Sequence, residues 1–160
     1  MSKTINRHSY EKKDGEWVIK STYSIDFEPI EYNSENLDKV IKLVKNNLDT
    51  SLLSRTYKKE NKHNVYYGHC YHSTQAIYYL MDTDKLVPYS GKDDNGELHW
   101  WLQDGDKIID ATSEQYENKG ISPPYNKGKQ SKWYGWKNRP HKRSLSLIKR
   151  VLMDIFYESI

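Results

Sequence analysis

The chain has 160 residues, of which 36% are apolar and 29% are charged, and its formal net charge is +3. This length fits one domain with a buried core, and 14 Tyr and 5 Trp can supply apolar surface for that core. The absence of a run of about 18 apolar residues argues against a membrane span and a membrane partner, and a single cysteine excludes an internal disulfide.

The first part of the chain predicts a strand and one or two helices. Its first ten residues are polar and lack the apolar stretch of a signal peptide, which favours a cytoplasmic protein. The Asp14-Gly15 pair indicates a turn before a strand over 16–25. A cap at Asn33 or Ser34 then begins a helix. Its apolar stripe consists of Leu37, Val40, Ile41, Val44 and Leu48.

Residues 51–57 continue this helix or form a short second one, and residues 58–64 read as a charged loop leading to a site. The elements expected after this loop are a helix over 70–81, a strand over 85–89, a hairpin over 97–103 and 107–111, and a closing helix over 142–157. Pro88 makes the strand over 85–89 short or places it at an edge.

Together these elements predict an α+β fold with a small antiparallel sheet packed against helices. We expect one domain over 1–160, with a core at about 16–116 and a basic aromatic loop at about 118–140. The loop is too long for an ordinary connection, which is typical of a functional or disordered segment.

Cys70 is the feature with most chemical content, because it begins the helix predicted over 70–81. If Asp104-Gly105 is a two-residue hairpin turn, partners across the hairpin sum to 209 and His99 faces Asp110. A helix N-terminus and a nearby imidazolium favour the reactive thiolate. His99 would then act as base and acid, and Asp110 would orient its ring.

The backbone N–H of Cys70 is the natural first donor to an oxyanion. For the second donor the sequence leaves Asn64, Tyr66 and Tyr67 open. A structural interpretation also stays open, since a lone cysteine at a helix start is often an inert buried side chain and a His–Asp pair is often only a hydrogen bond.

The order Cys70, His99, Asp110 resembles the papain-like thiol enzymes, most closely their transglutaminase-like and NlpC/P60-like groups. His99-Trp100 and Asp110-Ala111-Thr112 are similar to the transglutaminase core pattern. The resemblance covers about residues 64–116. It implies a papain-like core and a hydrolase, deamidase or acyltransferase that cleaves an amide or ester through a thioester, without a cofactor, on a protein, peptide or small amide. Expected substrate-binding residues are Tyr67, His69, Trp100, Trp101 and Trp133.

A zinc site is a weaker chemical alternative. His63, His69, Cys70 and His72 lie close in sequence, but adjacent His69 and Cys70 point in different directions on a helix, and the CxxC and HxxxH spacings are absent. We therefore expect no metal.

The non-enzymatic alternative is binding of nucleic acid or another acidic partner. Residues 118–150 carry ten Lys and Arg and no Asp or Glu, interleaved with Trp and Tyr that could stack on bases. The cations expected to act are Lys127, Lys129, Lys132, Lys137 and Arg139. A match to the acidic remainder of the protein itself is equally open.

Overall fold

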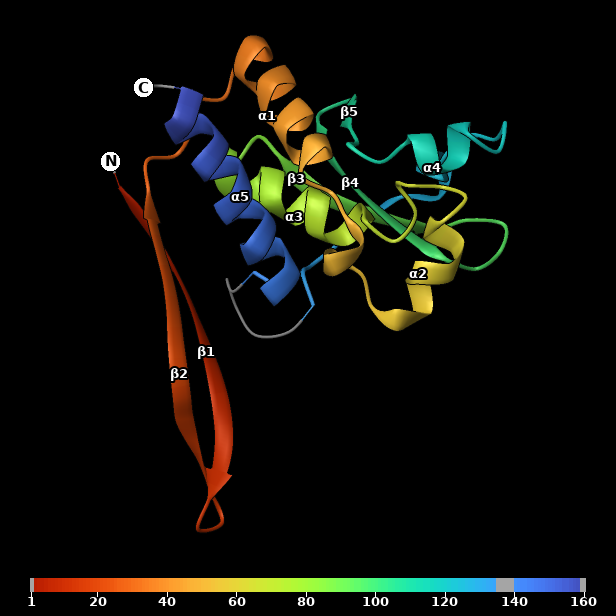
Figure 1. Ribbon diagram of the computed structural model, residues 1–160. Helices are drawn as coiled ribbons and strands as arrows, with labels where there is room; N and C mark the ends of the chain where they lie inside the picture. The colour runs from red at the N-terminus through yellow and green to blue at the C-terminus, as the bar shows by residue number, and fades with distance from the viewer. Residues whose placement is uncertain (1, 135–139, 159–160) are drawn as a thin grey trace.

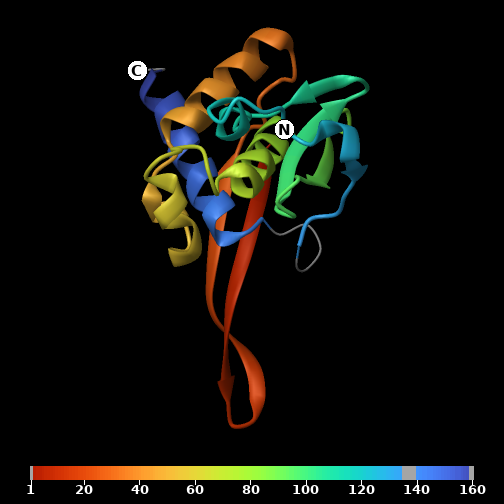
Figure 2. The ribbon, with the colours of Figure 1, turned by 90° about the vertical axis from the view of Figure 1, so that its right-hand side faces the viewer.

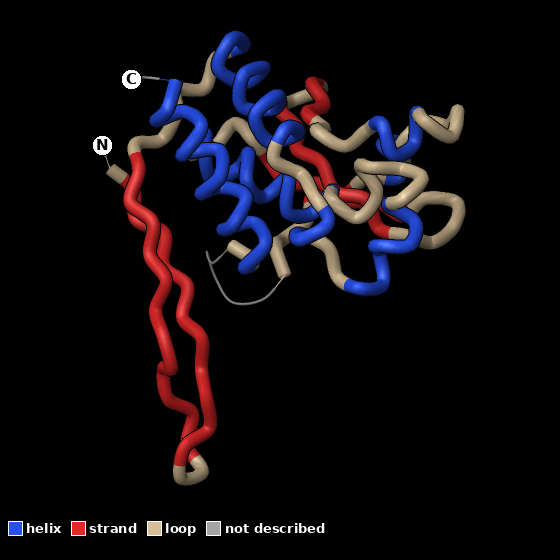
Figure 3. Tube along the Cα trace, in the orientation of Figure 1, coloured by secondary structure: helices blue, strands red, loops and turns tan. Residues whose placement is uncertain are grey.

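The structure is a computed structural model that describes residues 2–134 and 140–158, and it is a mixed α+β fold with two antiparallel sheets (Figures 1 and 3). The elements are β1 (Lys3–Lys13), β2 (Glu16–Phe27), α1 (Ser34–Asn46), η1 (Thr50–Leu52), α2 (Arg55–Asn61), α3 (Cys70–Met81), β3 (Val87–Lys92), β4 (Leu98–Asp104), β5 (Lys107–Ile109), α4 (Glu114–Glu117), η2 (Tyr125–Lys127), β6 (Lys129–Gln130) and α5 (Lys142–Glu158). No helix within these described ranges is long and apolar enough to cross a bilayer.

Strands β1 and β2 form a long hairpin whose tip extends away from the body (Figure 1). Asp14 and Gly15 have φ of 53° and 82°, as a type I′ turn requires at both central positions. Buried Ile5 and Phe27 anchor its base, and Arg7 and Tyr23 contact the body through the carbonyl oxygen of Pro140 and the ammonium group of Lys149. The sequence did not predict β1, because it lacks apolar alternation and pairs with β2 through polar side chains such as the hydroxyls of Ser9 and Ser21.

Helix α3 lies against the four-stranded sheet, and α1 and α5 pack against α3 and against each other (Figure 2). The predicted bounds of α3 are confirmed, and Asn33 caps α1 by accepting a hydrogen bond from the N–H of Asn36 at 2.8 Å. Because α3 contacts α1, α5 and strand β4, it is buried on nearly all sides. This packing fixes the helix whose first residue is Cys70.

The second sheet has the strand order β5-β4-β3-β6, so the strand that contains Pro88 is short, with six residues, but does not lie at an edge, and it covers 87–92 rather than the predicted 85–89. Pro88 pairs with Leu102 of β4, whereas β6 on the other side pairs only with Tyr89 and Ser90, so no residue of β6 requires the missing N–H of Pro88. Its carbonyl accepts a hydrogen bond from the N–H of Ser131 at 2.9 Å.

The hairpin register also differs from the predicted one. Leu102 pairs with Ile109 and Asp104 with Lys107, so Gly105 and Asp106 form the turn, one residue later than expected. Gly105 has a φ of +58° at the first turn position, where a type II′ turn needs glycine. Strand β5 consequently ends at Ile109, and Asp110 lies just beyond it.

Two loops predicted from the sequence contain regular structure. Residues 58–61 belong to α2 rather than to a charged loop, and the basic aromatic loop contains η2 and β6. Helix α5 begins at the predicted Lys142. Lys137 and Arg139 lie outside the described residues.

Candidate active site

The thiol of Cys70 lies at the N-terminus of α3, at the surface of a cleft. As the first residue of the helix, its N–H has no acceptor within α3. Gly68 leads the chain into the helix with a φ of +86°, which a residue with a side chain adopts only under strain. The thiol is half-buried, and Sγ lies 3.9 Å from the carbonyl oxygen of Leu98.

His99 and Asp110 form a buried pair beside the thiol. Nε2 of His99 lies 2.6 Å from Oδ2 of Asp110, and the two side chains are 0% and 3% exposed. The two side chains pair although Asp110 lies one residue beyond β5 and is not the cross-strand partner of His99. The structure therefore brings Cys70, His99 and Asp110 together as the sequence predicts, by a different backbone route.

Asp110 accepts hydrogen bonds from His99, from the hydroxyl of Tyr125 and from both the N–H and the hydroxyl of Thr112. Oδ2 also accepts a hydrogen bond from the hydroxyl of Tyr125 at 2.8 Å, and Oδ1 accepts one from the N–H of Thr112 at 3.0 Å. A carboxylate so restrained has one orientation, and it fixes the ring of His99 with Nε2 toward Asp110. The other ring nitrogen, Nδ1, is then available on the opposite side.

The environment of His99 favours its charged form. Burial lowers the pKa of the imidazole, but hydrogen bonds to Asp110 and to the thiol of Cys70 outweigh burial, and the result is a pKa of about 9. Below that pH the imidazolium is the stable form. A positive charge next to a thiol favours the thiolate, which is the nucleophilic form of cysteine.

Gln115 is a polar residue of the site that the sequence analysis missed. Its Nε2 lies 2.8 Å from Nδ1 of His99, and the side chain is buried at the edge of the cleft. Asn64 fixes Gln115 by donating from Nδ2 to its backbone oxygen at 2.6 Å. The sequence offered one signal for Gln115, its position five residues after Asp110. The short helix α4, which directs Gln115 toward His99, was not predicted.

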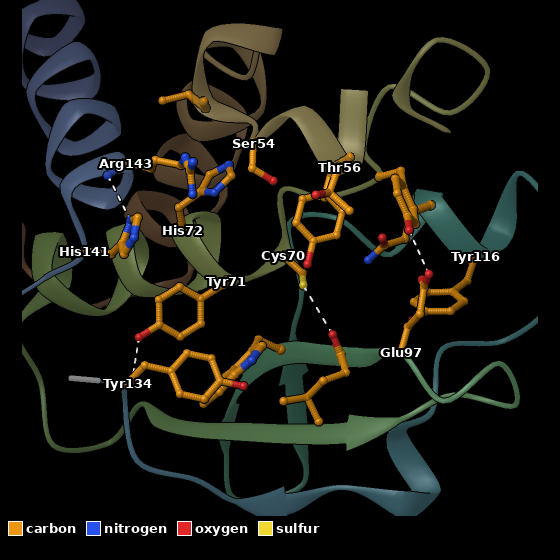
Figure 4. A pocket seen from close by; sticks show the side chains of 17 residues that line it. Ser54, Thr56, Cys70, Tyr71, His72, Glu97, Tyr116, Tyr134, His141 and Arg143 are labelled. Atoms are coloured by element: carbon orange, nitrogen blue, oxygen red, sulfur yellow. Dashed lines mark hydrogen bonds between the residues drawn. The ribbon is translucent and has the colours of Figure 1, made fainter. Parts of the chain in front are cut away.

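The cleft has a volume of about 500 Å³ and lies between α2, the start of α3, β4 and the start of α5 (Figure 4). Of the expected substrate-binding residues, Tyr67 and Trp100 line it. Trp101 is fully buried and stacks on the far side of His99. Trp133 stacks on Trp100, and His69 is buried beneath the helix start, so these residues are supports rather than walls of the cleft.

His69 and His72 form a second buried pair, with Nδ1 of His69 2.7 Å from Nε2 of His72. Burial lowers the pKa of His69 to about 4, and burial together with the charge of His69 lowers that of His72 well below its ordinary value. Both rings are therefore neutral in the folded protein near pH 7. Among residues 2–134 and 140–158 no group of three or more His, Cys, Asp or Glu is arranged to hold a metal ion.

This histidine pair should make the protein sensitive to acid. In the unfolded chain the two rings bind protons near pH 6.5, whereas in the folded protein they bind protons only at lower pH. The part of the free energy of unfolding that depends on neutral rings is therefore present above pH 6.5 and is lost as the pH falls toward 4. For His69 alone the loss is about 3 kcal/mol. Urea unfolding between pH 7 and pH 4.5 measures it. The double variant His69→Gln/His72→Gln should lose less stability over this range than His63→Gln, an exposed control; equal acid sensitivity would contradict the assignment.

The described part of the basic aromatic loop lies along the body of the protein. Trp133 packs against Tyr71, Tyr78 and Trp100, while Lys127 pairs with Asp94 at 2.9 Å. Lys129 and Lys132 are exposed. Binding of an acidic partner through this loop stays a prediction.

Comparison with protein-family models, with curated proteins and with solved structures finds no match to this chain. The functional argument therefore depends on the geometry of the site itself.

Proposed function

We propose that the protein is a cysteine-nucleophile enzyme that cleaves an amide or ester bond through a thioester intermediate. The observation that carries this proposal is the row formed by the Cys70 thiol, the buried His99 imidazole and the Asp110 carboxylate beside an open cleft of about 500 Å³. A merely structural cysteine needs neither a charged histidine nor access to a cleft. The layout supports the papain-like resemblance of the sequence.

In the acylation step the thiolate of Cys70 attacks the substrate carbonyl carbon and forms a carbon–sulfur bond. The tetrahedral oxyanion then collapses, the bond to the leaving amine or alkoxide breaks, and the His99 imidazolium gives its Nδ1 proton to that leaving group. Asp110 holds Nε2 and stabilises the positive charge on the ring before this transfer.

The thioester is resolved by a second nucleophile. Neutral His99 removes a proton from water or an amine as that molecule attacks the carbonyl, and the thiolate of Cys70 leaves. Water gives hydrolysis, and an amine gives acyl transfer. The same residues serve both outcomes, so the acceptor that reaches the cleft decides between hydrolase, deamidase and acyltransferase.

Gln115 is suited to stabilise the oxyanion together with the N–H of Cys70. Its Nε2 donates to Nδ1 only while Nδ1 is unprotonated; when the imidazolium forms, that donor is released beside the thiol. We expect Gln115→Met, which has a similar length and no charge but lacks the N–H donor, to slow acylation by about 100-fold. Alkylation by iodoacetamide creates no oxyanion and should change far less. An equal loss in both reactions would make Gln115 a structural residue.

A test of the function uses p-nitrophenyl acetate, an activated ester small enough for the cleft. The wild type should release p-nitrophenolate and carry an acetyl group on Cys70 that mass spectrometry locates and hydroxylamine removes. Cys70→Ser is the matched control, since it keeps the shape and loses the thiol. The proposal fails if Cys70→Ser releases p-nitrophenolate as fast as the wild type or if the wild type acetylates only lysines.

A further inference from the structure

The two ends of the cleft carry opposite charges, with Cys70 between them. Arg143 and His141 lie on one side of the thiol, and Glu97 lies on the other side, next to Tyr116 (Figure 4). Arg143 and Glu97 are the charged side chains among the described residues that line it. A substrate that reaches Cys70 therefore extends between a cation and an anion.

Arg143 lies in the first turn of α5 and is half-buried. Within residues 2–134 and 140–158 no carboxylate lies within 4 Å of its guanidinium, whereas Arg150 on the same helix pairs with Asp49 at 3.1 Å. Burial lowers the pKa of His141, and the neighbouring cations lower it further, so the ring is a neutral hydrogen-bonding group at this end. The charge of Arg143 is thus left for a ligand anion, for which a guanidinium is well shaped.

Glu97 lies between β3 and β4 and is exposed. Its Oε1 accepts a hydrogen bond from the hydroxyl of Tyr67 at 2.7 Å, and within the described ranges no Lys or Arg nitrogen lies within 4 Å of its carboxylate. Tyr57 and Tyr67 meet edge to face at 5.8 Å beside it. Lys119 already lies over the Tyr67 ring, 5.7 Å from its centroid, so this aromatic wall attracts cations.

We propose that the substrates are peptide-like amides that carry an anionic group on the Arg143 side of the scissile carbonyl and a cationic group on the Glu97 side. The proposal rests on the proposed function of Cys70 and names the substrate class of that site. Each charge would meet an unpaired opposite charge, and a uniformly acidic or basic substrate would place one end against a like charge, which is unfavourable.

The test uses trans-epoxysuccinyl inactivators, which alkylate a thiolate by opening the epoxide: the new carbon–sulfur bond replaces a carbon–oxygen bond, and the alkoxide takes a proton. Each probe carries one amino-acid amide on each side of the epoxide. The four probes bear Glu and Lys, Glu and Glu, Lys and Lys, or Gln and Gln. Rates are divided by that of the neutral Gln and Gln probe for the same variant.

The wild type should react fastest with the Glu and Lys probe, by about fivefold over either singly signed probe, since a partly exposed ion pair contributes about 1 kcal/mol. Arg143→Glu should move the preference to the Lys and Lys probe, and Glu97→Lys to the Glu and Glu probe. Lys142→Glu and Asp94→Lys make the same charge changes at exposed neighbours outside this cleft, and they should keep the wild-type preference.

The outcomes separate this inference from the function on which it rests. If the neutral probe fails to label Cys70, the proposed function falls. If all four probes label Cys70 at equal relative rates, or if the controls shift the preference as much as Arg143→Glu and Glu97→Lys do, the charge selection is wrong although the thiol is active.

Discussion

Asp110→Asn should slow acylation of Cys70 by p-nitrophenyl acetate by about 10²–10⁴-fold. The N–H of Thr112 requires an oxygen at the Oδ1 position, so the new amide nitrogen takes the place of Oδ2, which faces Nε2 of His99. A donor there forces Nε2 to become an acceptor and Nδ1 to carry the proton. His99 then cannot take a proton from the thiol, and it also loses the carboxylate that helps to raise its pKa.

Tyr125→Phe is the matched control for this prediction. It removes another hydrogen bond to the same Oδ2, but it leaves a carboxylate facing His99. We expect a decrease of less than about tenfold, since one neutral hydrogen bond is lost. Equal slowing in Asp110→Asn and Tyr125→Phe would contradict this account, because Asp110 would then not act by setting the charge and tautomer of His99.

Gly68→Ala should lower the free energy of unfolding by about 2–5 kcal/mol and disturb the entry into α3. The left-handed backbone at φ +86° disfavours any side chain, and the new Cβ would lie 2.9 Å from both Cδ2 of Leu53 and Cβ of Tyr57. Relief of this clash would displace α2 or the loop before Cys70. Urea unfolding and the acylation rate measure both effects.

Gly120→Ala separates the two causes. Gly120 has a similar φ of +72°, but no atom lies within 4 Å of the position of its Cβ. Only backbone strain remains there, and we expect a loss of about 1–2 kcal/mol with normal acylation. If Gly68→Ala and Gly120→Ala lowered the free energy of unfolding by the same amount, the close packing around Gly68 would not be what positions Cys70.

The sequence predicted those elements for which the residues that indicate them lie within the element or next to it in the chain. Helix α3 was found with its bounds because its apolar residues and start signal agree, and the cap at Asn33 was found because its side chain acts locally. Strand β1 was missed because polar cross-strand pairs stabilise it. The sequence did not indicate that β3 lies inside its sheet, because β6, which pairs with its other side, is two residues long and belongs to a segment that reads as a loop.

The site was predicted better than the backbone that builds it. His99 and Asp110 were paired through a predicted hairpin turn that lies one residue too early, and the two side chains nevertheless form a hydrogen bond from just beyond the end of β5. Gln115 was missed because only the tertiary turn through α4 brings it to His99. The opposite charges of Arg143 and Glu97 could not be seen, since 46 positions separate residues that share one cleft.

The most direct test of the central claim, that His99 activates Cys70, is the pH dependence of Cys70 alkylation by iodoacetamide in the wild type and in His99→Gln. The wild type should react faster than His99→Gln at pH values below about 9, where His99 is charged, and this difference should disappear above that pH. Rates that rise tenfold per pH unit to above pH 8 in both proteins would contradict the claim, because Cys70 would then react as an ordinary thiol.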